Sequence, residues 1–415
     1  MNPDFDVDKS KEEFNTTNIN LFIMLKMKIS ALATFLVLVV GLENAYTQGF
    51  WEPVTNITGY ISTEFNYFDD LDGYEVSYGA AVSEAGMLVT YRPTSNFSIK
   101  SVFVYRPGYD FDLMLNEAFG ELNTSDALKI KVGRFLTPLS PMNTYYYAPV
   151  NTSATLPIII TNNENFPLNI DGISLNGSLG ESFKLKYDVF GGGYTNSTWK
   201  PSGAISFFGQ EVPYYKAQIN SQFTIGESYN GSYNVGVGGK VSVAYESYVE
   251  VGAGFFNPKK ETMPIAITLP QNALGAGSPA MNITSPTGIK RPTWGYNAKL
   301  KYGNTEVNAE YWTGDIQLDA IAYDFTGGAG SPTVLQAESE VELEGRFIQL
   351  SHRIDKFIPY ARYEFQHTSD AKYKRYSAGI NYKPSFTRTV KLEYVHYEHK
   401  SGNINGLVAA LIYSF

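Results

Sequence analysis

The sequence predicts an all-β protein: a transmembrane antiparallel β-barrel of about sixteen strands, with an inward-folded loop. Three observations support this class. Segments of roughly ten residues alternate between apolar and polar side chains, the chain ends on a strand whose last residue is aromatic, and an apolar segment near the amino terminus has the pattern of an export signal.

The amino-terminal segment has the composition of a secretory signal peptide. Lys26 and Lys28 precede an apolar run over residues 29–41, and small residues follow it. This run is too short to cross a bilayer as a helix, which needs about 20 apolar residues. A one-pass membrane anchor is the weaker alternative. We therefore expect three parts: an extension ahead of the true start over 1–23, a signal peptide over 24–47 and a single barrel domain over 48–415.

Two-residue periodicity recurs through the barrel domain. In segments 57–68 and 215–225, apolar side chains alternate with Thr, Ser, Asn, Gln, Lys or Glu, so one face suits lipid and the other suits water. Bacterial barrels of one chain have an even number of strands, so we expect sixteen, with eighteen as the alternative. Similar runs occur near 97–106, 183–190, 233–245, 294–302, 306–312, 357–366, 375–383 and 389–397.

The last strand has the pattern that closes a barrel. Leu407, Ala409, Leu411, Tyr413 and the terminal Phe415 fall on one face of an extended strand. A barrel pairs its last strand with its first and places aromatic rings at the membrane interface. The alternative is the final strand of a soluble sandwich.

Composition excludes several classes of function. The chain has no Cys, which excludes a disulfide scaffold, a thiolate metal site, a Cys nucleophile and a lipid-modified Cys. Residues 48–415 carry 28 basic and 35 acidic side chains, a balance that does not favour nucleic acid as a partner. We expect no cofactor.

The connections differ in length and character. Short turns at 92–96 and 383–385 suit the periplasmic rim. Two long segments, 257–292 and 313–339, show little periodicity and are expected as surface loops. The third, 138–170, is rich in Tyr, Ile and Pro, so it should not extend freely into water. It either packs on the rim or against another subunit, or it folds into the lumen as a constriction.

Several short motifs carry a resemblance to a known family. They are Lys131–Pro138 (KVGRFLTP), Asp171–Gly177 (DGISLNG), Gly379–Pro384 (GINYKP) and the strand Lys391–Tyr394 (KLEY). Together with the closing aromatic residue, they resemble blocks of outer-membrane porins related to the phosphate-selective porin family. The resemblance implies a sixteen-stranded barrel, usually trimeric, that passes small solutes through a channel narrowed by an inward loop. It also implies that Arg134 borders the narrow zone.

The polar faces of the expected strands carry more basic than acidic side chains, which indicates a mild anion preference. Strict alternation from Ile130 and Val132 would point Arg134 at lipid, and a bulge near Gly133 would turn it inward. We expect these residues to line or constrict the pore: Lys100, Arg106, Lys129, Lys131, Arg134, Tyr145, Tyr146, Tyr147, Arg362, Glu364 and Arg375.

Catalytic and metal-binding patterns are weak. No G-x-S-x-G motif or Walker loop is present, and His396 and His399 point to opposite faces of a strand, so they cannot jointly bind one metal. The sequence therefore predicts no enzyme but a passive porin of a Gram-negative outer membrane. Its expected partners are outer-membrane lipid, small hydrophilic solutes and further copies of the chain in a homotrimer. The alternatives are a membrane-embedded hydrolase and an exported all-β adhesin or binding protein.

Overall fold

The computed structural model divides the chain into two units, Met1–Glu52 and Pro53–Phe415. The expected extension and signal peptide, and the strand expected over 215–225, lie outside the described residues. No helix within the described ranges is long and apolar enough to span a membrane. The structure describes residues 52–69, 77–106, 114–161, 165–194, 204–207, 210–213, 234–269, 281–324, 333–368, 371–399 and 402–415.

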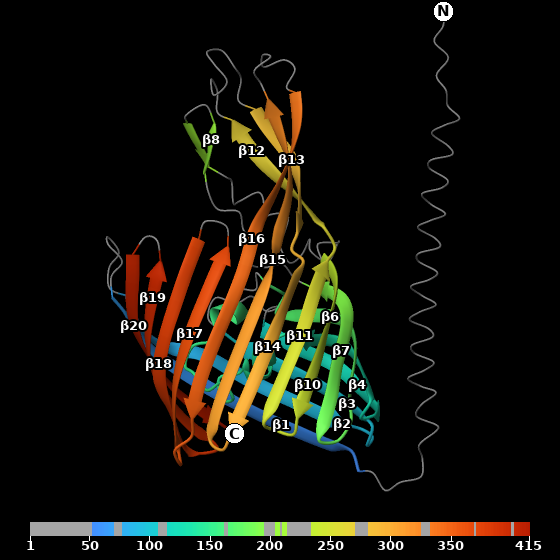
Figure 1. The fold of residues 1–415 in the computed structure, drawn as a ribbon, viewed down its shortest axis with the longest axis vertical. Coiled ribbons are helices and arrows are strands. Elements are labelled where there is room, and N and C mark those ends of the chain that lie inside the picture. Colours follow the sequence, from blue (N-terminus) through green and yellow to red (C-terminus); the bar gives the residue numbers. More distant parts are fainter. Residues whose placement is uncertain are drawn as a thin grey trace, which may run out of the picture. The chain divides into compact units, whose positions relative to one another are not determined.

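Antiparallel strands of the second unit form one closed wall (Figure 1). The sheet contains 18 strands, of which β12 and β13 form a hairpin attached beyond the wall, so 16 strands make the barrel. This confirms the expected fold class and strand number. The barrel strands are β1 (Val54–Phe68), β2 (Ser77–Arg92), β3 (Phe97–Tyr105), β4 (Leu115–Ser125), β5 (Leu128–Leu136), β6 (Asn169–Leu179), β7 (Phe183–Tyr194), β10 (Asn234–Tyr245), β11 (Val249–Pro258), β14 (Thr293–Tyr302), β15 (Thr305–Asp324), β16 (Thr333–His352), β17 (Phe357–Thr368), β18 (Ala371–Ser385), β19 (Arg388–His399) and β20 (Gly402–Ser414).

The first and last strands close the barrel. β1 pairs with β20 from Tyr60–Ser414 to Phe68–Gly406. The terminal residue extends this ladder, because Gly59 and Phe415 exchange two backbone hydrogen bonds of 2.9 Å. A Cβ atom at Gly59 would lie 2.5 Å from the Phe415 ring, so this close approach requires glycine. The expected role of the carboxy-terminal strand in closure is therefore confirmed.

Two segments expected as surface loops form strands instead. Segment 257–292 contains β12 (Glu261–Leu269) and β13 (Met281–Lys290), which pair with each other along their whole length. Segment 313–339 contains the distal parts of β15 and β16, whose ladder continues to Asp324–Thr333. Gly, Pro and Ser content predicted irregular structure there, but a hairpin ladder satisfies its own backbone groups without needing an apolar face. A separate two-stranded sheet joins β8 (Ala204–Phe207) and β9 (Gln210–Pro213).

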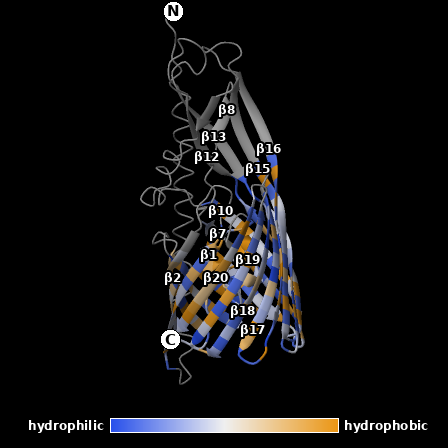
Figure 2. Ribbon diagram, turned by 90° about the vertical axis from the view of Figure 1, so that its left-hand side faces the viewer, coloured by the Kyte–Doolittle hydropathy of each residue, from blue (hydrophilic) through white to orange (hydrophobic). Residues whose placement is uncertain are grey.

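The wall is apolar outside and polar inside, the reverse of a soluble protein. Along β19, Val390 and Leu392 are 42% and 45% exposed, whereas the alternating Lys391 and Glu393 are 1% and 0% exposed. Hydrophobic and hydrophilic residues also alternate along the coloured strands of the wall in Figure 2. Such a wall suits a lipid exterior and a polar lumen.

Candidate pore and its inward loop

The connection between β5 and β6 contacts the inner face of the barrel on several sides. It contains a 3₁₀ helix, η1 (Pro141–Tyr145), and one helical turn, α3 (Ile158–Thr161). Ser140 donates a hydrogen bond of 2.7 Å to Glu310 on β15, and Thr293 on β14 donates one of 2.5 Å to the backbone oxygen of Asn165. Segment 138–170 therefore folds into the lumen, as one of the two expected alternatives predicted.

A buried ionic cluster on β17, β18 and β19 holds this loop; we call it the anchor cluster. It consists of Arg362, Glu364, Arg375, Lys391 and Glu393, all at most 4% exposed. Glu364 pairs with Arg362 and, at 2.6 Å, with Arg375, and Arg362 lies 3.3 Å from Glu393. Because the two arginines and two glutamates pair with one another and Lys391 donates hydrogen bonds to the loop, each buried charge has a partner.

The anchor cluster binds the loop largely through its backbone. The backbone amide of Ile158 donates a hydrogen bond of 2.6 Å to Glu364, and that of Thr155 donates one of 2.8 Å to Glu393. Lys391 donates to the backbone oxygens of Ala148 and Ser153 over 2.8 and 2.9 Å. Because the cluster binds these loop residues largely through backbone atoms, their side chains give little indication of the contact in the sequence.

A second attachment lies on β1, β2 and the end of β3. Arg106 pairs with Glu84 over 2.6 Å and donates a hydrogen bond to Tyr146, whose ring lies 4.3 Å from the guanidinium carbon. The Glu84 carboxylate also accepts a hydrogen bond from the Tyr60 hydroxyl and one of 3.3 Å from the backbone amide of Ala148. Burial raises the pKa of Tyr147, the next loop residue, so its phenol stays protonated. The loop is therefore held from two parts of the wall.

An apolar cluster fills the space between the loop and the wall. Trp312 is fully buried and packs edge to face on Phe166, with ring centroids 4.8 Å apart. Loop residues Leu139, Met142 and Ile159 belong to the same cluster. The lumen at this level is therefore packed with side chains, and any open path must pass beside the cluster.

A polar chamber lies beside the loop. Its volume is about 310 Å³, and Pro138 at the start of the loop contributes to its lining. Lys186 and Glu250 form an ion pair of 2.7 Å across it, and Lys129 and Lys240 line it without an ion pair to any described residue. The chamber is also lined by Asp126, Asn176, Gly177, Ser178, Tyr187, Asp188 and Ser242.

The structure places most of the expected pore residues on the inner side. Arg106, Tyr146, Arg362, Glu364 and Arg375 hold the loop, as described above. Tyr147 packs in the apolar cluster between the loop and the wall. Three lysines lie apart from the loop contact: Lys100 pairs with Glu117, Lys131 lies 3.5 Å from Glu121, and Lys129 lines the chamber. The side chain of Tyr145 falls outside the described part of the structure.

Arg134 does not face the lumen, so its expected place in the pore lining is wrong. Gly133 has a positive φ of 127°, but the register of β5 continues without a shift to both neighbours at this point. Arg134 is therefore on the same face as Val132, whose register partner Ile173 is exposed on the outside. Its guanidinium pairs with Asp171 over 2.5 Å.

Sequence reasoning did not select several residues that form the site. Glu84 and Glu310 bind the loop, and Asp188 and Glu250 line the chamber. All of them occupy inward positions of alternating strands. That alternation could have identified them as lumen-facing, but it could not indicate which wall positions meet the loop.

Among the described side chains, Glu342, Glu344 and His367 form a group with the spacing of metal ligands. These residues lie on the outer face, where Glu344 and His367 are register partners. The other histidines with described side chains have separate partners: His352 contacts Thr305 and His396 contacts Asn405. These contacts provide no convergence of Ser, His and an acidic residue.

Solved structures of bacterial outer-membrane proteins share this architecture. An anion-selective porin from Comamonas acidovorans matches with a TM-score of 0.54 and 12% identity, over 88% of this chain and all of that chain. The chain has the porin fold. The trimer form of OmpT, an outer membrane protein of Vibrio cholerae, matches with a TM-score of 0.53 at 12% identity, over 88% and 100% of the two chains. OmpF of Salmonella typhi, solved in complex with daunomycin, matches with a TM-score of 0.53 and 12% identity. The match covers 87% of this chain and 97% of that chain. No protein-family model and no curated protein sequence matches this porin-fold chain.

Proposed function

We propose that the protein is a porin of a Gram-negative outer membrane, which admits small hydrophilic solutes by passive diffusion and catalyses no reaction. The observation that carries the proposal is the closed barrel with an exposed apolar exterior and a polar interior, in which a loop narrows the lumen. Such a barrel is stable in lipid because every wall strand has two partners. Transport then depends on the width and polarity of the lumen.

The path for solutes lies on the chamber side of the lumen. On the opposite side, the loop and the anchor cluster fill the space with paired charges. Lys129 and Lys240 add positive charge to the chamber beside the Lys186–Glu250 pair. Since most other inward charges are paired, we propose only a mild anion preference. The narrower resemblance to phosphate-selective porins is not needed for this proposal.

Planar bilayers test the proposal directly. The purified full chain should insert and give discrete conductance steps, and a salt gradient should give a reversal potential whose sign indicates weak anion preference. Absence of conductance from protein that shows the heat-dependent gel mobility of a folded barrel would refute the channel function. A reversal potential of the opposite sign would refute only the charge preference.

We also propose that the porin is a homotrimer. The Arg134–Asp171 pair supports contact between copies, because a charged pair on the outer wall is unfavourable against lipid and more favourable against a polar protein surface. Arg134 also donates to the backbone oxygen of Leu115 over 3.2 Å, which extends this polar area on the outer face of β4, β5 and β6.

A further inference from the structure

Three side chains with metal-binding groups meet on the outer face of the barrel, where the ladder between β16 and β17 ends. Glu344 and His367 are register partners one row before its last pair, Leu343 and Thr368. Glu342 lies two residues from Glu344 on the same face of β16, where this strand continues beside β15 alone. One donor atom of each side chain lies within 4.8 Å of the other two. Glu342, Glu344 and His367, which we call the His367 cluster, therefore converge.

The imidazole of His367 makes no hydrogen bond with another residue of the described ranges. This residue is only 9% exposed, and its Nδ1 atom lies 3.7 Å from the Glu342 carboxylate. That separation is too long for a hydrogen bond. It suits two ligands of one zinc ion, which stand roughly 3.3–3.7 Å apart when each bonds at about 2.0–2.1 Å. Because buried polar groups normally have partners, a bound ion would supply the one that this ring lacks.

The charge around the His367 cluster favours a cation. Asp315 on β15 is the exposed register partner of Glu342, and like charges opposite each other on a sheet are destabilising. The outward carboxylates of this region are Asp315, Glu340, Glu342 and Glu344, and the adjoining outward cations are Arg346 and Lys372. Four negative and two positive side chains leave two negative charges, which one divalent ion balances.

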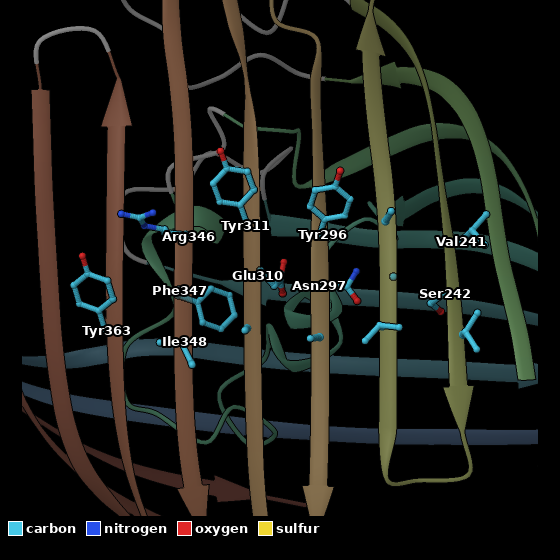
Figure 3. A pocket seen from close by; sticks show the side chains of 16 residues that line it. Val241, Ser242, Tyr296, Asn297, Glu310, Tyr311, Arg346, Phe347, Ile348 and Tyr363 are labelled. Carbon is cyan, nitrogen blue, oxygen red and sulfur yellow. The ribbon is translucent and has the colours of Figure 1, made fainter. Parts of the chain in front are cut away.

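Arg346 leaves room for a metal ion on Glu344. Its guanidinium lies 3.4 Å from one carboxylate oxygen of Glu344 and 4.7 Å from the centre of the Phe365 ring. Figure 3 shows Arg346 on the outer wall with Tyr311, its register partner. Because a carboxylate has two oxygens, one oxygen of Glu344 can bind the metal while Arg346 holds the other and fixes the orientation of the group.

We propose that the His367 cluster is a zinc site, in which His367, Glu342 and Glu344 supply three ligands and water occupies the fourth position. One imidazole nitrogen with two carboxylate oxygens suits Zn²⁺ better than Ca²⁺ or Mg²⁺, which prefer oxygen alone. Binding must draw the donors together by about 1 Å, and Glu342 can rotate because its side chain is 63% exposed. Bound zinc then links β17 to the part of β16 that extends beyond their shared ladder. This inference goes beyond channel function and does not depend on it.

Titration of the full chain with metal ions tests the site. Protein without an affinity tag is folded in detergent micelles, treated with a chelator, freed of the chelator and titrated with ZnCl₂ in an isothermal calorimeter. We expect one zinc ion to bind per chain. CaCl₂ under the same conditions should bind at least about tenfold more weakly, because Ca²⁺ gains little from the imidazole nitrogen.

Matched variants identify the ligands. His367→Gln and Glu342→Gln should each weaken zinc binding by about tenfold or more, because each removes one of three protein ligands. Two controls should leave it unchanged: His352→Gln at the other end of β16, and Glu398→Gln, whose carboxylate pairs with Lys374 on the outer wall.

Heat-dependent gel mobility shows whether each variant has folded. Glu342→Gln should fold even if His367→Gln does not, because the Glu342 side chain is largely exposed. Failure of the folded parent chain to bind zinc, equal affinity for Zn²⁺ and Ca²⁺, or unchanged zinc affinity in folded Glu342→Gln would overturn the proposal.

Discussion

The two sides of the lumen use charged residues in opposite ways. On β17–β19, the anchor cluster is withdrawn from solvent, and the side chains of Arg362 and Glu364 are 0% and 1% exposed. On the chamber side, Lys186 and Glu250 form a comparable pair but remain 42% and 26% exposed. The first set of charges fixes a protein segment, and the second lines an aqueous space.

This difference shows that an inward charge in a barrel does not by itself identify a pore residue. The two charges of a buried pair must lie within hydrogen-bonding distance of each other. If one of them is lost, no solvent is present to stabilise the other. In an exposed pair, each charge is also hydrated by solvent and gains little from its partner. Either residue can therefore be replaced with a small effect on stability. The same alternating pattern thus encodes a structural contact on one side and solvent contact on the other.

Removing the loop should produce the largest effect. Deletion of residues 145–160 with a short Gly-Ser linker removes the segment between the anchor cluster and the chamber, and we expect single-channel conductance to increase about twofold or more. Conductance in planar bilayers measures this. A matched deletion of the β12–β13 hairpin, which lies beyond the barrel wall, should leave conductance nearly unchanged. Equal conductance in both deletions would contradict the narrowing role of the loop.

Neutralising one carboxylate on each side should separate the two kinds of pair. Glu364→Gln leaves Arg362 and Arg375 without their shared partner and should lower the free energy of unfolding by about 3–5 kcal/mol. Glu250→Gln should cost at most about 1 kcal/mol, because Lys186 remains hydrated. Urea-induced unfolding in detergent micelles, followed by Trp fluorescence, compares the variants. Similar losses for both would show that exposure does not distinguish the pairs.

The sequence was sufficient to predict the barrel because its alternating pattern reports the environment directly. In β19, Val390 and Lys391 could be assigned to lipid and lumen without any knowledge of partners, and the terminal Phe415 predicted closure. The same local logic was wrong for segment 313–339. There, β15 and β16 pair with each other beyond the apolar band, so hydrogen bonding rather than alternation determines the structure.

The candidate site was less predictable because it depends on contacts between distant segments. Alternation could place Glu364 and Arg375 in the lumen, but the loop they hold offers mainly backbone atoms, which have no signature in the sequence. Arg134 illustrates the opposite problem. Strict alternation pointed it outward, the family resemblance pointed it inward, and the uninterrupted register of β5 agrees with alternation.

Charge reversal in the chamber should alter selectivity without altering the fold. Combined Lys129→Glu and Lys240→Glu replacement should shift the anion-to-cation permeability ratio toward cations by roughly a factor of two, because both side chains line the chamber. Reversal potentials across a salt gradient measure the ratio. Lys374→Glu, on the outer wall, is the control and should leave it unchanged. An unaltered ratio in the chamber variant would place the solute path elsewhere.

The smallest effect on transport is expected at Arg134. Because this residue pairs with Asp171 on the outer wall, Arg134→Gln should leave the reversal potential unchanged but weaken association between copies. Native mass spectrometry in detergent measures the trimer fraction. Exchange of the two charges, Arg134→Asp with Asp171→Arg, should restore part of the trimer that either single replacement loses, since the pair is rebuilt with reversed polarity. A changed reversal potential would return Arg134 to the pore, and an unchanged trimer fraction in Arg134→Gln would exclude the β5–β6 face as the contact between copies.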